Sequence, residues 1–272
     1  MCIRDRAYDA ESPDGFERMA AYFAERAAGG VGMIITGGIA PNEEGGMVFR
    51  DENGDAIFTA SKLSTDAEAD GHKLITDAVH TADPDVKICM QILHMGPLAI
   101  NDQLVAPSAV RSRISKFTPN ELDAEGIEKQ IDDHVNCARL AQKAGYDGVE
   151  IIGSAGYLIS TFLVEKTNMR TDEYGGSYEN RMRFALEVVR RCRAAVGEDF
   201  IIIFRIAGMD MLEGGMSWDE VALLARELEK AGASVISTHF TWHESAVPTI
   251  ATMVPRAAFT SVTARVRKEV SI

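Results

Sequence analysis

The sequence has few residues from which a metal site or a disulfide framework could be built. The four cysteines among its 272 residues form no CxxC pair and no zinc or iron–sulfur spacing: Cys2, Cys89, Cys137 and Cys192. The six histidines include no HExxH motif. We therefore expect unpaired thiols in a reducing compartment and no metal site.

Positive charge and long apolar runs are also scarce. Lysine and arginine number 28 against 41 aspartates and glutamates, which gives a net charge of −13. No basic stripe offsets this charge, so neither nucleic acid nor an anionic membrane is expected as a partner. No stretch approaches the 18 or so apolar residues of a membrane span, and the first residues lack the apolar core of a signal peptide. We expect a cytoplasmic protein.

What the sequence does contain is a repeated pattern: an amphipathic, helix-like stretch followed by a short apolar run. The apolar runs are continuous rather than alternating, which indicates strands buried on both faces of a parallel sheet. The pattern predicts an α/β fold with strands near residues 32–37, 86–93, 148–152, 200–206 and 234–239.

Two architectures fit this pattern, a doubly wound sheet and a (β/α)8 TIM barrel. The GxGxxG and phosphate-loop motifs are absent, and polar or glycine residues follow the strand ends, where barrel enzymes place their chemistry. The long segments 40–66 and 97–124 are expected to be loops over that face, with room for short hairpins. We therefore predict a TIM barrel.

Five strands are too few to close such a barrel. We predict an incomplete one, with about strands 2 to 6 present and strand 1 and strands 7 and 8 missing. In this interpretation residues 7–272 form a partial barrel domain that is inactive by itself, and residues 1–6 lie outside it.

One segment is dense in motif residues. Residues 156–184 read GYLISTFLVEKTNMRTDEYGGSYENRMRF, and QILHMG (91–96), IIIFRIAG (201–208) and WHESAVPTIATMVPRAAF (242–259) lie on either side in order. This set resembles the flavin-dependent ene-reductases related to old yellow enzyme. Within that family the chain most resembles the N-terminal barrel of the bacterial NADPH-dependent 2,4-dienoyl-CoA reductases.

The resemblance to that branch depends on a local difference. Simple enone reductases of the family carry a polar pair five and two positions before the motif tyrosine, and this pair holds the substrate carbonyl. Here those positions are Ile152 and Ala155, and a WHE motif follows the last predicted strand, as in the dienoyl-CoA branch. The resemblance therefore implies an acyl-CoA thioester as substrate, with a simple enone as the alternative.

The resemblance also implies roles for individual residues. Tyr157 would donate the proton, since a phenol with an ordinary pKa near 10 stays protonated at about pH 7. His243 would assist protonation or polarise the thioester carbonyl. Glu244 and Lys166 would bind substrate, with Lys166 at a position where the family carries arginine.

The cofactor implied is FMN, which carries the hydride. Gly38 would allow the backbone to approach the flavin ring, Gln91 would hydrogen-bond its pyrimidine edge, and Arg205 would stabilise the reduced anion. FAD, an iron–sulfur cluster and NADPH also serve the full-length members of the branch, at sites expected outside this chain. Asp172, Asn180 and Arg181 are expected to tie their loop to the following helix.

Other interpretations remain open. The same barrel could belong to a general ene-reductase or an amine dehydrogenase. It could also be a non-catalytic binding module, in which Gly38, Gln91 and Arg205 are a turn glycine, a loop amide and part of an ion pair, and Tyr157 is a packing residue.

Overall fold

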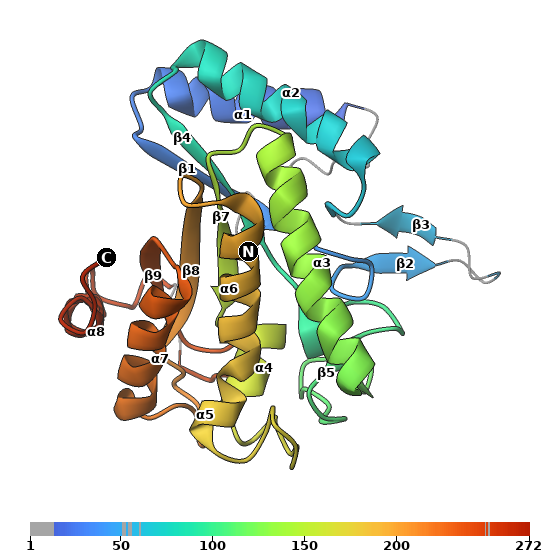
Figure 1. The fold of residues 1–272 in the computed structure, drawn as a ribbon, viewed down its shortest axis with the longest axis vertical. Coiled ribbons are helices and arrows are strands. Elements are labelled where there is room, and N and C mark those ends of the chain that lie inside the picture. The colour runs from blue at the N-terminus through green and yellow to red at the C-terminus, as the bar shows by residue number, and fades with distance from the viewer. Residues whose placement is uncertain (1–13, 51–52, 54–55, 60, 248, 250) are drawn as a thin grey trace.

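The computed structural model describes residues 14–50, 53, 56–59, 61–247, 249 and 251–272 (Figure 1). Its main sheet contains five strands: β1 (Met33–Ile39), β4 (Lys87–Ile92), β7 (Gly148–Gly153), β8 (Ile201–Met209) and β9 (Val235–Phe240). All neighbouring pairs are parallel. The five predicted strands are therefore confirmed, with ends that differ by a few residues.

The order of the strands favours a barrel wall over a doubly wound sheet. The spatial order β1-β4-β7-β8-β9 is the same as the order along the chain. A doubly wound sheet reverses its order at a switch point, and this sheet has no reversal. Each crossover therefore moves in the same direction, as it does around a barrel.

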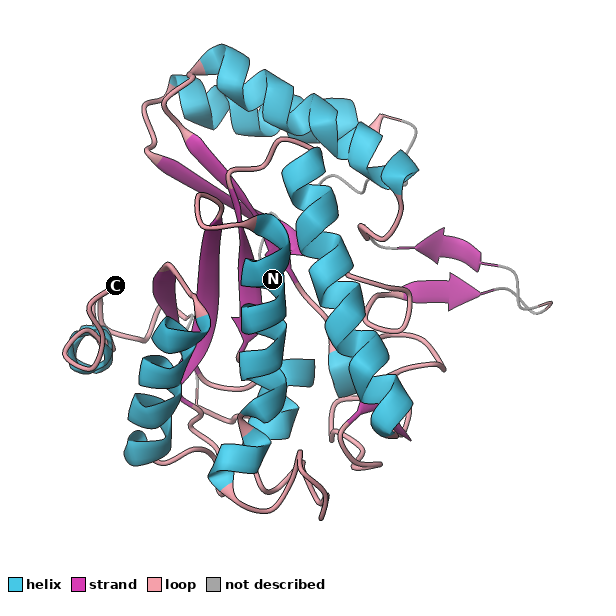
Figure 2. Cartoon of the chain, in the orientation of Figure 1, coloured by secondary structure: helices cyan, strands magenta, loops and turns pink. Residues whose placement is uncertain are grey.

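The long helices form one layer. They are α1 (Gly15–Ala28), α2 (Asp66–Ala82), α3 (Ala124–Lys143), α6 (Arg183–Val196) and α7 (Trp218–Ala231). Helices next to each other in this series pack side by side, and Figure 1 shows α3, α6 and α7 in front of the sheet. In Figure 2 the strands of the main sheet lie together behind this layer, as the strands of a barrel lie inside its ring of helices.

The edges of the sheet are β1 and β9, each bonded to one neighbour among the described residues. The edge strands expose Met33 (43%) and Val235 (38%). The expectation that strand 1 and strands 7 and 8 are missing is not confirmed by this sheet and stays a prediction. The boundary proposed at residue 7, and Cys2, lie outside the described residues.

Short elements occupy the loops. The first long loop carries the hairpin β2 (Val48–Arg50) and β3 (Ala56–Thr59), and the second carries η2 (Gly96–Leu98), β5 (Val105–Ala106) and β6 (Asn120–Glu121). Three short helices complete the fold: α4 (Leu158–Leu163), α5 (Tyr178–Arg181) and α8 (Thr260–Val266). The hairpin expected in the first loop is therefore present.

The loop from residue 170 to α5 is held by hydrogen bonds, as expected. Arg181 is buried and donates to the Leu163 carbonyl at 2.9 Å and to Glu165 at 2.9 Å. Asn180 donates to the Gly175 carbonyl at 3.1 Å, and Asp172 pairs with Arg170. These contacts stabilise the segment that follows α4.

Three buried histidines lie among the helices and the strand ends. His72 of α2 lies 2.9 Å from the Tyr146 hydroxyl, and burial lowers the pKa of its imidazole from 6.5 to about 4. His94 stacks on His134 with ring centroids 6.0 Å apart, and burial lowers the pKa of each. All three imidazoles are therefore neutral at pH 7.

The protein is expected to lose stability as the pH falls from 6.5 toward 4. In this window the unfolded chain takes up protons that the folded protein excludes, so folding stability rises with pH. For His72 alone the loss between pH 7 and pH 4.5 should be about 2–3 kcal/mol. Urea unfolding at both pH values would measure it. The variant His72→Phe should show a smaller difference, and an unchanged difference would contradict the assignment.

Candidate active site

Tyr157 and His243 form a hydrogen-bonded pair at the carboxyl ends of β7 and β9. The Tyr157 hydroxyl lies 2.7 Å from His243 Nε2, and the two rings meet edge to face with centroids 5.2 Å apart. The residues are 86 positions apart in the sequence. The structure therefore brings the two proposed catalytic residues into direct contact.

The backbone that carries this pair is tightly turned. Ala155 and Gly156 have φ angles of 69° and 89°, and Thr241 has φ 79°. The His243 amide donates to the Ala155 carbonyl at 3.2 Å, which ties the two loops together. Trp242 packs against Gly156, where an added Cβ would lie 2.9 Å from the indole ring. A larger residue at position 156 would therefore push the two loops apart.

Asp210 anchors the loop that carries His243. Its side chain is 3% exposed and accepts from Trp242 Nε1 at 2.6 Å and from the Met216 amide at 2.7 Å. Burial raises the pKa of Asp210, while these two donors act in the opposite direction. Sequence reasoning missed this residue, although a carboxylate directly after an apolar strand was a possible signal.

The electrostatics of the pair suit proton transfer. Partial withdrawal from water lowers the pKa of His243, so its imidazole is neutral at pH 7. In the tautomer that carries the proton on Nε2, the imidazole donates to the phenol oxygen and stabilises the phenolate formed when Tyr157 gives up its proton. The arrangement can therefore act as a supported general acid.

The three proposed flavin residues lie at the same end of the sheet. Gly38 of β1 is the register partner of Gln91 of β4. Gln91 donates to Glu150 of β7, which lies 3.8 Å from Arg205 of β8. The side chains of Gln91 and Arg205 therefore meet through one buried carboxylate, Glu150, which is 1% exposed.

Arg205 has a second neighbour that the sequence reasoning did not assign. Its Nη2 lies 3.2 Å from Nδ1 of His239, a residue of β9. Burial first, and then the charge of Arg205, lowers the pKa of His239 to about 4, so the imidazole is neutral at pH 7. Because a guanidinium only donates, Nδ1 is the accepting nitrogen in this contact. His239 and Glu150 together fix the guanidinium. A charged residue within the apolar run GVEIIG was the signal for Glu150.

These residues fit FMN by the chemistry of their side chains. Within the described part of the chain no donor bonds Gln91 Oε1, so the amide keeps an acceptor beside a guanidinium donor. Gly38 also has a packing reason to be glycine, because an added Cβ would lie 2.3 Å from Leu93 Cδ2. Its role toward the flavin stays a prediction.

Lys166 and Glu244, the proposed substrate residues, line one cavity of about 230 Å³. Trp242 and Gly156 form part of the same wall, next to His243 and Tyr157 in the sequence. The structure therefore places both proposed substrate residues beside the catalytic pair.

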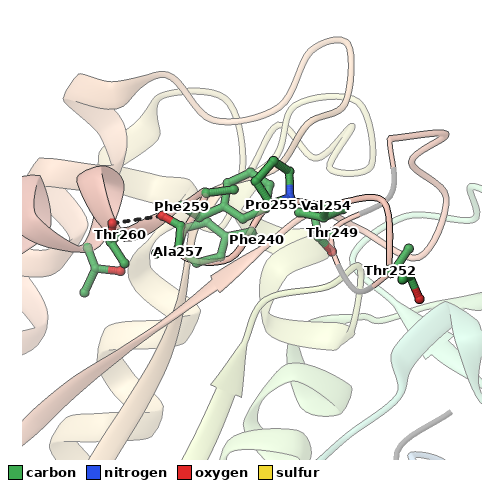
Figure 3. A pocket seen from close by; sticks show the side chains of 11 residues that line it. Phe240, Thr249, Thr252, Val254, Pro255, Ala257, Phe259 and Thr260 are labelled. Atoms are coloured by element: carbon green, nitrogen blue, oxygen red, sulfur yellow. Dashed lines mark hydrogen bonds between the residues drawn. The ribbon is translucent and has the colours of Figure 1, made fainter.

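A larger cavity of about 650 Å³ lies between the end of β9 and α8 (Figure 3). Phe240 and Phe259 stack in it with centroids 4.9 Å apart, and the Thr260 hydroxyl donates to the Ala257 carbonyl at 2.9 Å. None of the residues that line it has an ionisable side chain. This cavity offers apolar surface rather than acid–base chemistry.

Two histidines near the end of β9 have the spacing of a metal-binding pair. His239 and His243 stand four residues apart, but their ring nitrogens contact Arg205 and Tyr157 respectively. No group of three or more potential metal ligands occurs among the described residues. In the same part of the chain no helix is long and apolar enough to cross a membrane.

Comparison with known proteins decides the family. The model of the NADH:flavin oxidoreductase / NADH oxidase family matches residues 2–272. The chain belongs to this family. It is an old yellow enzyme-like FMN oxidoreductase, as its motifs indicated.

Individual relatives agree with this family. The metal reductase of Desulforamulus reducens is 37% identical over 260 residues, which are 94% of this chain and 37% of that protein. The solved complex of 2-naphthoyl-CoA reductase with 2-naphthoyl-CoA has a TM-score of 0.85 and 28% identity, over 97% of this chain and 41% of that one. An old yellow enzyme homologue from Zymomonas mobilis has a TM-score of 0.74 and 27% identity, over 96% of this chain and 73% of that one. The chain spans about a third of the length of some of the curated relatives it matches and about two thirds of the length of others.

Proposed function

We propose that this flavin oxidoreductase reduces a conjugated carbon–carbon double bond of an enoyl- or 2,4-dienoyl-CoA thioester. FMN supplies the hydride when it is bound. Tyr157 supplies the proton, and His243 stabilises the phenolate that remains. The observation that carries the proposal is the 2.7 Å contact between the Tyr157 hydroxyl and His243 Nε2.

The strand before Tyr157 supports a thioester substrate. Ile152 and Ala155 are buried and apolar, so they offer no hydrogen bond to a substrate carbonyl. His243, on the neighbouring loop after β9, is then a polar group that can polarise one. The similarity to a naphthoyl-CoA reductase points the same way.

A general ene-reductase that acts on simple enones is the second candidate, favoured by the similarity to an old yellow enzyme homologue. Steady-state rates of the full-length, FMN-loaded enzyme with hexa-2,4-dienoyl-CoA and with cyclohex-2-enone would separate the two. A higher kcat/KM for the thioester supports the proposal. A higher value for the enone would favour the second candidate, and no reduction of either would favour an amine dehydrogenase or a non-catalytic module.

The electron path is also part of the proposal. In the full-length enzyme we expect NADPH to deliver electrons through FAD and an iron–sulfur cluster to the FMN. Those sites would lie outside the 272 residues, together with the barrel strands that would pair with β1 and β9.

The 272-residue chain expressed alone is expected to be poorly soluble and not to retain FMN. Met33 and Val235 expose apolar side chains on the two edge strands, and such edges promote aggregation. Gel filtration and an absorbance spectrum would test this. A monomeric yellow preparation would refute it.

Arg205→Met should lower the reduction potential of bound FMN, because a cation near the flavin favours the reduced anion. For a two-electron couple about 30 mV corresponds to about 1.4 kcal/mol, so a shift of a few tens of mV is expected. Redox titration of the holoenzyme measures it, with Arg190→Met as a control for an exposed arginine on α6. An unchanged potential would place Arg205 away from the flavin.

A further inference from the structure

The cavity beside the catalytic pair has a basic lining in an acidic protein. Arg111, Arg113 and Lys166 line it, together with one carboxylate, Glu244. The lining therefore carries two net positive charges, whereas the whole chain carries −13. Two of the cations come from the loop after β5 and the third from the segment after α4, so separate parts of the chain supply this charge.

One of these three cations has a carboxylate partner among the described residues. Arg113 Nε lies 3.7 Å from Glu244 Oε2. Within the described residues neither Arg111 nor Lys166 has an ion-pair partner. Most other lysines and arginines of the chain pair with a carboxylate or donate to a backbone carbonyl, as Arg181 does. Unpaired cations that face one cavity attract an anion.

The cavity adjoins the reacting groups. Gly156, which precedes Tyr157, forms part of its wall, and Trp242 and Glu244 flank His243 in the sequence. Its volume of about 230 Å³ is below the roughly 300–1,000 Å³ of a site that encloses a whole drug-sized ligand. It is therefore suited to one part of a larger substrate, held next to the proton donor.

We propose that this cavity is a subsite for an anionic group of the substrate, with Arg111 and Lys166 as its binding cations. The anion is a phosphate of a nucleotide-linked thioester or a carboxylate. The inference deepens the proposed function and rests on it for the place of the reaction. The binding itself requires no reduction of the ligand.

The test measures binding to the full-length, FMN-loaded enzyme by isothermal titration calorimetry. The ligands are coenzyme A for the phosphate, hexa-2,4-dienoate for the carboxylate and cyclohex-2-enone as a neutral reference. The variant carries Arg111→Gln and Lys166→Gln. The matched control carries Arg190→Gln and Lys268→Gln, two exposed cations away from the cavity, so its net charge changes equally.

We expect the cavity variant to bind the anionic ligand about 25-fold more weakly, since an exposed charge pair contributes up to about fivefold. Weaker binding of coenzyme A alone identifies the anion as phosphate, and weaker binding of the dienoate identifies a carboxylate. The enone should bind unchanged. The proposal is overturned if neither anion binds the parent enzyme, if the control variant loses as much affinity, or if enone binding falls equally. An enzyme that binds these anions but reduces no thioester would refute only the proposed function.

Discussion

Replacing Tyr157 with phenylalanine is expected to lower dienoyl-CoA turnover by about 10²–10⁴, the usual contribution of a positioned general acid. The substitution removes the hydroxyl that lies 2.7 Å from His243 Nε2 and leaves the ring in place. Reduction of the flavin by NADPH should stay near normal, because that half-reaction needs no proton from Tyr157. Stopped-flow measurement of the two half-reactions separates these effects.

His243→Ala should lower the rate of dienoyl-CoA reduction by a similar factor. The double variant should lose less than the product of the two single losses, because residues that act as one unit are not additive. Tyr22→Phe, which removes a phenol hydroxyl on α1, serves as the control and should be silent. If Tyr157→Phe slowed flavin reduction as much as substrate reduction, the residue would be structural and another group would supply the proton.

The second large effect is expected at Asp210, which we predict to be a positioning residue for His243. Asp210→Asn keeps the size of the side chain but replaces one accepting oxygen with a donor. One of the two buried N–H groups, on Trp242 or on Met216, then loses its partner. An unpaired buried polar group costs about 1–3 kcal/mol, so unfolding measurements should show a loss of this size.

Catalysis should fall as well, because the Trp242 indole sits between the loops of Tyr157 and His243. A displacement of about 1 Å in an active site can cost 10²-fold, and we expect Asp210→Asn to lower kcat by up to this factor with KM little changed. Trp242→Phe removes the same hydrogen bond from the other side. The two variants combined should therefore cost no more in kcat than the larger single loss. Asp77→Asn, an exposed carboxylate of α2 that pairs with Lys73, is the control for stability.

A fall in stability without any change in kcat would show that Asp210 only holds the fold. A changed kcat that is fully additive with Trp242→Phe would show that the two residues act separately. The pH profile of kcat provides a further readout, since displacement of His243 changes the surroundings that lower its pKa.

The order of apolar and polar residues along the chain was sufficient to predict the strands and the position of the candidate site. Continuous apolar runs predicted the five strands, because parallel strands covered on both faces need apolar residues at every position. The residues after those runs predicted the site, because the carboxyl ends of parallel strands meet at one end of the sheet. Tyr157, His243, Gln91 and Arg205 all lie there.

The order of residues along the chain did not predict side-chain contacts between segments that are far apart in the sequence. Glu150 links Gln91 to Arg205 across three strands, and Asp210 bonds a tryptophan 32 positions away. Gly38 shows the same limit: a flavin was the expected reason for the glycine, while the nearest neighbour of an added Cβ is Leu93.

The sequence by itself determined the fold class and the family and supplied the candidates for the reacting side chains, because each of these depends on residue type and short spacing along the chain. Only the tertiary structure decided which groups support them. In that structure Tyr157 contacts His243, and Asp210 accepts a hydrogen bond from Trp242. Arg111 and Lys166 line one cavity. Those relations depend on how the loops turn at the ends of β4, β7, β8 and β9. Burial and packing determine the conformation of those turns, and neither can be predicted from a short stretch of the sequence.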